Sequence, residues 1–294
     1  MRGAKSVITF GAAGSNHALA TALYARECGM NAVLILGPQH NSFHVHENLQ
    51  AMYEAGAILR PCSWKNTIGA TVKIFHEVWK QDGVPPYVIP PGGSSPTGVL
   101  GFVNAVCELH QQVEAGLLPE PDLIYVASGT MGTCIGLALG INALGMKSRV
   151  MAIRVTTEPY TGMTRAQRLF RSANQMLRCA DPQFPACVLS SDRFVIRDEF
   201  FGEEYALHTP EGIAAVKFAE ETLHLRLEGT YTGKAFAGLR ADASAEELKD
   251  KNVLFWNSYH GGAPKLSAGT FSHTCLPALL QGYFESETQR LDIV

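Results

Sequence analysis

Short runs of β-branched and other apolar residues alternate along the chain with segments of helical periodicity. Seven runs predict buried strands, several of them without the polar alternation of a half-exposed sheet: residues 6–10, 32–36, 57–60, 87–89, 123–127, 149–155 and 253–256. The segments between most of these runs are compatible with helices, as in a parallel sheet covered by helices. The pattern therefore predicts an α/β fold.

The clearest helix start lies just after His208. Thr209 can cap free backbone amides, Pro210 suits the first helical position, and Glu211 favours the positive end of a helix. These signals predict a helix that ends near Leu225.

A stretch rich in proline and glycine separates the first three strand–helix units from the rest of the chain at residues 85–96. It predicts a smaller domain at residues 1–95 and a larger domain at residues 96–294. A second loop-rich zone, residues 180–201, is interpreted as a lid or a surface insertion.

The composition and charge of the chain limit the kinds of molecule that it is expected to bind. The 294 residues are 46% hydrophobic and 17% charged with a formal net charge of -3, so a basic surface for nucleic acid or an anionic membrane is not expected. The seven cysteines form no C-x-x-C pair, which predicts reduced thiols and no metal site. Residues 123–146 carry no charge, but a polar glycine-rich turn interrupts them, and the N-terminus lacks a secretory pattern. We therefore expect a cytoplasmic protein that acts on a small molecule.

Three glycine-rich turns stand where a predicted strand ends and a helix can begin: Gly14-Ser15-Asn16-His17, Gly92-Gly93-Ser94-Ser95 and Ser128-Gly129-Thr130-Met131-Gly132-Thr133. That position gathers exposed amides at the positive end of a helix and suits a carboxylate or a phosphate. The third turn is the best phosphate cradle, because its small residues let a ligand approach the backbone. Taken alone, each turn is also explained as a tight α/β connection without a ligand.

A dinucleotide site is a weaker interpretation of the third turn. The turn lacks the G-x-G-x-x-G order, no P-loop lysine follows it, and the next predicted strand offers Arg154 rather than an acid for a ribose. A nicotinamide enzyme is therefore only a minor alternative.

Four segments carry a resemblance to a known family: Gly-Ser-Asn-His-Ala at 14–18, Ile-Pro-Pro-Gly-Gly-Ser-Ser-Pro-Thr-Gly at 89–98, Ala-Ser-Gly-Thr-Met-Gly at 127–132 and Leu-Glu-Gly-Thr-Tyr-Thr-Gly-Lys-Ala at 227–235. In this order they resemble the D-cysteine desulfhydrase and 1-aminocyclopropane-1-carboxylate (ACC) deaminase family. Its members have the tryptophan-synthase-β-like fold and use pyridoxal 5'-phosphate (PLP). The resemblance implies two three-layer αβα domains, the larger of them incomplete at its N-terminal side.

The resemblance also implies roles for individual residues. Ser15 matches a serine poised over the substrate for proton transfer or nucleophilic attack, and Asn16 matches the residue that bonds the cofactor's 3-hydroxyl. Backbone amides from Ser15 to His17 would hold the substrate carboxylate. Tyr231 would face the substrate as an acid/base group, and Ser258 would meet the ring nitrogen, although its turn is longer than the family's. The cofactor phosphate would be held by five consecutive residues: Ser128, Gly129, Thr130, Met131 and Gly132.

One residue gives a hint about the substrate. Thr232 follows Tyr231, where desulfhydrase-like members carry threonine and the deaminases tend to carry glutamate. The resemblance therefore implies β-elimination from a small amino acid rather than opening of a cyclopropane ring. On their own, His44 and His46 are interpreted as surface residues, and Lys234 as a helix residue that points at solvent or at the phosphate region.

No lysine of this chain matches the lysine that carries the cofactor in the family. In the family it lies in a Gly-Asn-Lys type of segment, a whole helix upstream of Ser-Asn-His. Here Lys5 is the only lysine before Ser15, and it directly precedes a strand. The resemblance thus implies a chain that is truncated at its N-terminus and lacks this lysine. Two hypotheses follow: a PLP-dependent lyase or deaminase with its start recorded too late, or a non-catalytic relative that binds PLP or amino-acid anions non-covalently. Relatives suggest a homodimer.

Overall fold

The structure is a computed structural model, and it describes residues 3–260 and 271–292. The chain divides into two compact units, Met1–Gly93 with Gly262–Val294, and Ser94–Gly261. The first change of unit falls two residues before the boundary expected at residue 95. The C-terminal segment groups with the first unit, whereas the sequence analysis placed residues 96–294 in one domain.

The first unit contains a parallel sheet with the strand order β3-β2-β1-β4. Its strands are β1 (Ser6–Ala12), β2 (Asn31–Gly37), β3 (Ile58–Pro61) and β4 (Tyr87–Val88). β1 pairs with β2 along its whole length. Six of the seven residues of β2 are buried, because helices cover both faces of a parallel sheet.

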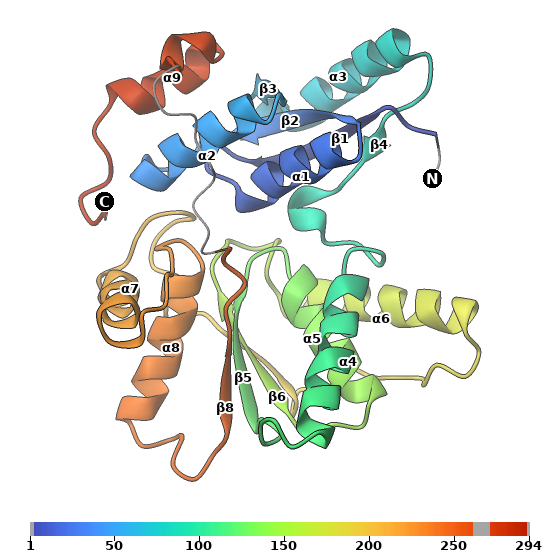
Figure 1. Ribbon diagram of the computed structural model, residues 1–294, viewed down its shortest axis with the longest axis vertical. Helices are drawn as coiled ribbons and strands as arrows, with labels where there is room; N and C mark the ends of the chain where they lie inside the picture. The colour runs from blue at the N-terminus through green and yellow to red at the C-terminus, as the bar shows by residue number, and fades with distance from the viewer. Residues whose placement is uncertain (1–2, 261–270, 293–294) are drawn as a thin grey trace. The chain divides into compact units, whose positions relative to one another are not determined.

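Helices cover both faces of this first sheet (Figure 1). On one face lie α1 (Asn16–Glu27), α2 (Phe43–Glu54) and α9 (Ala278–Glu285), which share a core with β2. On the other face α3 (Thr67–Asp82) packs through buried Ile74 and Val78. Three short 3-10 turns complete the described helical structure: Trp64–Asn66, Pro91–Gly93 and His273–Cys275.

The second unit contains another parallel sheet, with the strand order β7-β6-β5-β8. Its strands are β5 (Leu123–Ser128), β6 (Arg149–Arg154), β7 (Phe194–Arg197) and β8 (Val253–Trp256). β5 lies between β6 and β8 and is buried at all six positions. Its carboxyl end therefore lies in the middle of the sheet edge from which the strands lead into their helices.

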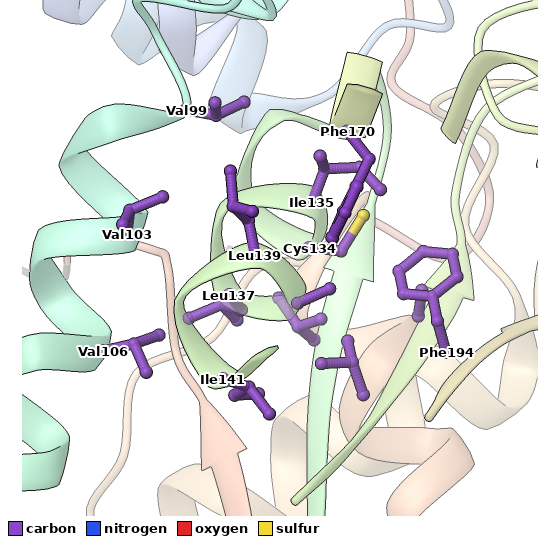
Figure 2. Packing of buried hydrophobic residues seen from close by; sticks show 14 of the residues in the cluster. Val99, Val103, Val106, Cys134, Ile135, Leu137, Leu139, Ile141, Phe170 and Phe194 are labelled. Carbon is purple, nitrogen blue, oxygen red and sulfur yellow. The ribbon is translucent and has the colours of Figure 1, made fainter. Parts of the chain in front are cut away.

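Five helices cover the second sheet (Figure 1): α4 (Leu100–Glu114), α5 (Gly132–Ala143), α6 (Met163–Ala180), α7 (Pro210–Leu223) and α8 (Thr232–Ser244). The first three share one core cluster with the sheet, and α8 packs against the opposite face. α5 is buried at every position from Cys134 to Ile141. Figure 2 shows Val103 and Val106 of α4, and Val99 directly before that helix, directed toward it.

All seven predicted strands are confirmed, with ends that shift by at most two residues. The predicted start of α7 is also confirmed, because Thr209 Oγ1 accepts a hydrogen bond from the Gly212 amide at 3.1 Å. The helix ends at Leu223, two residues early, since His224 adopts a left-handed φ of 53°. No helix among residues 3–260 and 271–292 is long and apolar enough to cross a membrane.

The interpretation of residues 180–201 as a lid or surface insertion is wrong for its C-terminal part. β7 lies in this zone, pairs with β6, and buries Phe194 in the main core of the second unit. A strand of four residues is too short to show a periodic pattern, so its single apolar run was not recognised.

Candidate cofactor and substrate site

The third glycine-rich turn, residues 128–133, joins β5 to α5 and includes the start of that helix. Met131 caps α5 with a φ of 75°, a left-handed conformation that costs a non-glycine residue about 1–2 kcal/mol. Its side chain is 1% exposed and belongs to the core, so packing holds the strained residue in place. Four amides of this turn make no hydrogen bond within the described part of the chain: those of Gly129, Thr130, Met131 and Thr133.

Ser94 closes one side of the turn. Its Oγ accepts from the Gly132 amide at 2.9 Å and lies 2.7 Å from Thr130 Oγ1. A Cβ on Gly132 would lie 2.7 Å from the same Oγ, so glycine is required for this close approach. Ser94 belongs to the second glycine-rich turn, and its direct contact with the third was not foreseen.

The hydroxyl of Ser128 does not face a ligand. Ser128 is 1% exposed, and its Oγ lies 3.3 Å from the Sγ of Cys134 inside the core. Burial raises the pKa of the Cys134 thiol to about 12, so this cysteine stays protonated and chemically inert. Ser128 is one of the five residues expected to hold the phosphate, but its hydroxyl is already engaged in this contact.

Tyr231 lies beside this turn. A Cβ on Gly129 would lie 3.4 Å from Tyr231 Cε1, so the tyrosine ring stands against the glycine backbone. The Tyr231 hydroxyl is 2.5 Å from that of Tyr205. Burial raises the pKa of Tyr205 to about 12 and raises the pKa of Tyr231 well above its usual value. Both phenols are thus protonated at neutral pH.

Glu228 fixes the backbone around Tyr231. Its carboxylate accepts from the amides of Thr230, Tyr231 and Thr232 at 2.8–2.9 Å. Thr232 is 1% exposed and its hydroxyl donates to Glu228 Oε1. A carboxylate at the start of α8 is favoured there by the free amides and the helix dipole. The hydroxyl of Thr232 is therefore part of a helix cap.

In the first unit, the first glycine-rich turn joins β1 to α1. Ser15 is 6% exposed and caps α1, with its Oγ 3.2 Å from the Ala18 amide. The Ser15 amide donates to the Ala12 carbonyl at 3.0 Å. Of the three amides from Ser15 to His17, those of Asn16 and His17 have no partner among the residues that the structure describes. Two of the three predicted carboxylate-binding amides are thus available.

Asn16 is held by two residues of α2. Its Oδ1 is 2.8 Å from His44 Nε2 and 2.9 Å from Asn48 Nδ2. Because the carboxamide oxygen only accepts, its Nδ2 is left as a donor with a fixed direction. The interpretation of His44 as a surface residue is therefore wrong. His46 also lies half-buried, with Nε2 2.7 Å from the Tyr283 carbonyl.

His17 has a defined tautomer. Thr9 Oγ1 donates to the Ile89 carbonyl at 3.1 Å, so it accepts from His17 Nε2 at 2.8 Å. Burial lowers the pKa of His17 to about 4. The imidazole is therefore neutral at physiological pH and keeps an unprotonated Nδ1.

Ser258 is exposed and follows β8 by two residues. Since β8 is parallel to β5, with Trp256 opposite Val126, Ser258 and the turn after β5 lie at the same edge of the second sheet. The next two glycines in the sequence, Gly261 and Gly262, fall outside the described residues.

The third glycine-rich turn, between β5 and α5, offers amides, hydroxyls and glycines, and it contains no carboxylate side chain. Such donors at the amino end of a helix suit a phosphate monoester. Comparison with known proteins is consistent with this chemistry. Residues 2–258 match the family model described as pyridoxal-phosphate dependent enzyme. The chain belongs to the pyridoxal-phosphate dependent enzyme family.

Solved structures agree with the assignment to the PLP family. An ACC deaminase homologue is 29% identical with a TM-score of 0.72, and the match covers 96% of this chain and 79% of that one. An O-ureido-L-serine synthase is 15% identical, with a TM-score of 0.55 and coverages of 87% and 71%. A serine racemase from Dictyostelium discoideum is 14% identical, with a TM-score of 0.52 and coverages of 90% and 77%. The last two show the fold alone, the tryptophan-synthase-β-like PLP fold.

Lys234 departs from its sequence interpretation. Its side chain is wholly buried rather than directed at solvent, and Nζ donates to the Phe201 carbonyl at 2.6 Å. Nζ also lies 5.4 Å from the centre of the Phe201 ring. Desolvation lowers the pKa of Lys234 to about 8, although the nearby Glu228 opposes the shift. A lysine that is partly neutral near pH 8 is thus buried three residues after Tyr231.

This lysine makes the stability of the second unit depend on pH. The pKa of Lys234 is about 8 in the folded state and 10.5 in its ordinary state, so between these values the unfolded chain binds more protons. The free energy of unfolding should therefore rise by about 1.5 kcal/mol between pH 8 and 9.5 because of this group. Urea unfolding of Lys234→Met should lack that rise. Lys217→Met, at an exposed site of α7, is the control, and an equal slope in Lys234→Met and the unsubstituted chain would contradict the prediction.

Proposed function

We propose that this chain binds PLP and supports desulfhydrase-like β-elimination from a small amino acid. The observation that carries the proposal is the contact between Tyr231 and the turn at Gly129, where a Cβ would lie 3.4 Å from the tyrosine ring. Two motifs that are far apart in the sequence meet there within one unit. An acid/base group beside a phosphate-binding turn supports the proposal, because a cofactor enzyme needs protein groups that bind and orient the cofactor and groups that move protons next to it.

The phosphate of PLP would be held by residues 128–132, through the unpaired amides of Gly129, Thr130 and Met131. The hydrogen bond between the Thr130 and Ser94 hydroxyls uses one of their two protons and leaves the other for the phosphate. Ser258, at the same sheet edge, is proposed to meet the ring nitrogen. When bound, PLP supplies an electron sink for the Cα of the amino acid. The protein's own residues supply binding, orientation and protons.

Tyr231 and Tyr205 together supply a proton. Two protonated hydroxyls that share one hydrogen bond use only one of their two protons for that bond. The other proton is free to be donated to a leaving group. The raised pKa of Tyr231 keeps this proton in place until a stronger base develops next to it.

In the first unit, the amides of Asn16 and His17 are proposed to hold the substrate carboxylate at the amino end of α1. The Nδ2 of Asn16, oriented by His44 and Asn48, is proposed to donate to the cofactor's 3-oxygen. The hydroxyl proton of Ser15 makes no hydrogen bond within residues 3–260 and 271–292, while its oxygen caps α1. We propose that Ser15 uses this hydroxyl for proton transfer to the substrate or for nucleophilic attack on it.

The position of Lys5 supports a second proposal, which concerns the lysine that carries the cofactor in the family. It lies at the amino end of β1 and its Nζ donates to the Asp82 carbonyl, whereas the Ser15 turn follows the carboxyl end of this seven-residue strand. At about 3.3 Å per residue the two ends are roughly 23 Å apart. We therefore propose that Lys5 does not carry the cofactor. The alternative to the proposed lyase is a non-catalytic relative that binds PLP or amino-acid anions non-covalently.

The experiment has two arms. Fluorescence titration of the chain with PLP, followed by borohydride reduction and peptide mass analysis, should show binding without a pyridoxylated lysine. The chain supplied with PLP should release sulfide from cysteine rather than 2-oxobutyrate from ACC. Tyr231→Phe should keep PLP affinity and lose at least about 100-fold in sulfide release. Tyr160→Phe, a 41% exposed tyrosine of the same unit, is the matched control.

Each result bears on a different part of the proposal. Failure to bind PLP would contradict the cofactor site, and a covalent adduct at one defined lysine would contradict non-covalent binding. Release of 2-oxobutyrate would contradict the choice of reaction. Full activity in Tyr231→Phe would remove the tyrosine from its proposed role.

A further inference from the structure

The carbonyl oxygens of the phosphate-binding turn face residues 156–165, the segment that follows β6 and begins α6. The Ser128 carbonyl also accepts from the Val155 amide at 3.1 Å, directly before this segment. Thr161 is 1% exposed, and its Oγ1 donates toward the carbonyls of Ser128 at 3.1 Å and Gly129 at 2.5 Å. Thr156 Oγ1 lies 3.3 Å from the Gly129 carbonyl and 2.7 Å from Thr161 Oγ1. The two hydroxyls form one buried network under the turn.

The same segment reaches the next carbonyl as well. Arg165 Nε donates to the Thr130 carbonyl at 3.3 Å. The Gly162 amide is 3.5 Å from the Sδ of Met131, the residue with the left-handed φ of 75°. Three consecutive carbonyls and the strained residue that follows them are therefore all contacted from residues 156–165.

The direction of these carbonyls fixes the direction of the amides. In a planar trans peptide the C=O of one residue and the N–H of the next point to opposite sides. Holding the carbonyls of residues 128–130 toward Thr161 and Arg165 thus turns the amides of residues 129–131 away from that segment. Those amides have no partner among the described residues.

We infer that Thr161 and Arg165 are positioning residues for the cofactor phosphate, which they serve by holding the turn with its amides presented to the anion. The inference rests on the proposed PLP site. Neither residue contacts the phosphate, since both lie on the carbonyl side of the turn. A preorganised set of donors binds an anion more tightly than one that must be ordered on binding.

The test compares PLP with pyridoxal, which has the same ring but no phosphate. Thr161→Val keeps the shape of the side chain and removes the hydroxyl. It should weaken PLP binding about tenfold, equivalent to about 1.4 kcal/mol, and leave the affinity for pyridoxal unchanged. Thr161→Ser, which restores a hydroxyl, should bind PLP like the unsubstituted chain. Thr164→Val, at an exposed site in the first turn of α6, is the matched control.

A second variant covers the case in which Thr161→Val does not fold. Arg165 is half-buried, so Arg165→Met is expected to fold, as checked by circular dichroism. It should show the same loss for PLP and not for pyridoxal. Arg168→Met, at an exposed site of the same helix, should bind both compounds normally.

The outcomes separate this inference from the proposed function. An unsubstituted chain that binds neither PLP nor inorganic phosphate would overturn both. If that chain binds PLP, and the folded variants at Thr161 and Arg165 bind it equally well, only the positioning role is overturned. A purely structural role would lower thermal stability while the ratio of PLP to pyridoxal affinity stays constant, and that result also overturns the inference.

Discussion

Gly136→Ala is expected to lower the free energy of unfolding of the second unit by about 3 kcal/mol, because the new methyl group has no room. A Cβ at this position would lie 2.5 Å from the Cβ of Phe102 and 2.7 Å from the Val99 carbonyl. Both atoms belong to or adjoin α4, which packs closely on buried α5 (Figure 2). Overpacking of a filled core costs about 1–3 kcal/mol, and more when backbone has to move.

Gly101→Ala is the matched control for this substitution. Gly101 is also a helical glycine, on α4, and a Cβ there would meet no atom within 4 Å. Its replacement should be neutral or should stabilise the protein by up to about 1 kcal/mol, because alanine is the better helix former. Urea unfolding followed by circular dichroism measures both. Equal free energies for the two variants would show that the α4–α5 contact is looser than the structure indicates.

Much of the fold could be predicted because parallel strands buried on both faces leave a plain signal. β2 and β5 are continuous apolar runs between polar turns, and such runs need no partner to be recognised. The start of α7 could be predicted for a similar reason, since Thr209 and Pro210 act on amides close to them in sequence. β7 carried no such signal, because four residues do not establish a period.

The candidate site was harder to predict from the sequence than the fold, because its most important contacts join segments that are far apart in the sequence. The turn at Gly129 could be found from its glycines and its place after a strand. The hydrogen bond of Tyr231 to Tyr205 joins residues without a shared motif, and nothing in the sequence marks Tyr205. Ser94 stood in a recognised turn, yet its contact with Thr130 depends on how α4 packs. Lys234 was misjudged because lysine is rarely buried.

Asp242→Ala is expected to have the largest effect on stability, a loss of about 3–5 kcal/mol. Asp242 on α8 is 5% exposed, accepts from Arg197 Nη1 at 2.6 Å, and accepts from the hydroxyl of Tyr125. Tyr125 is wholly buried, and burial together with the Asp242 carboxylate raises its pKa far above the usual value. Alanine would leave a buried phenol and a largely buried guanidinium without their shared acceptor.

Glu199→Ala is the control, because it removes an exposed partner of Arg197, whereas Asp242→Ala removes a buried partner of the same arginine. Glu199 is bound to Arg197 at 2.8 Å, but its side chain is 55% exposed, so its loss should cost less than about 1 kcal/mol. Chemical unfolding of both single variants and the double variant gives the coupling through Arg197. Because Tyr231 precedes α8 directly, Asp242→Ala should also weaken sulfide release, whereas Glu199→Ala should not. Equal losses of stability in the two single variants would mean that Asp242 is solvated and does not tie α8 to the sheet.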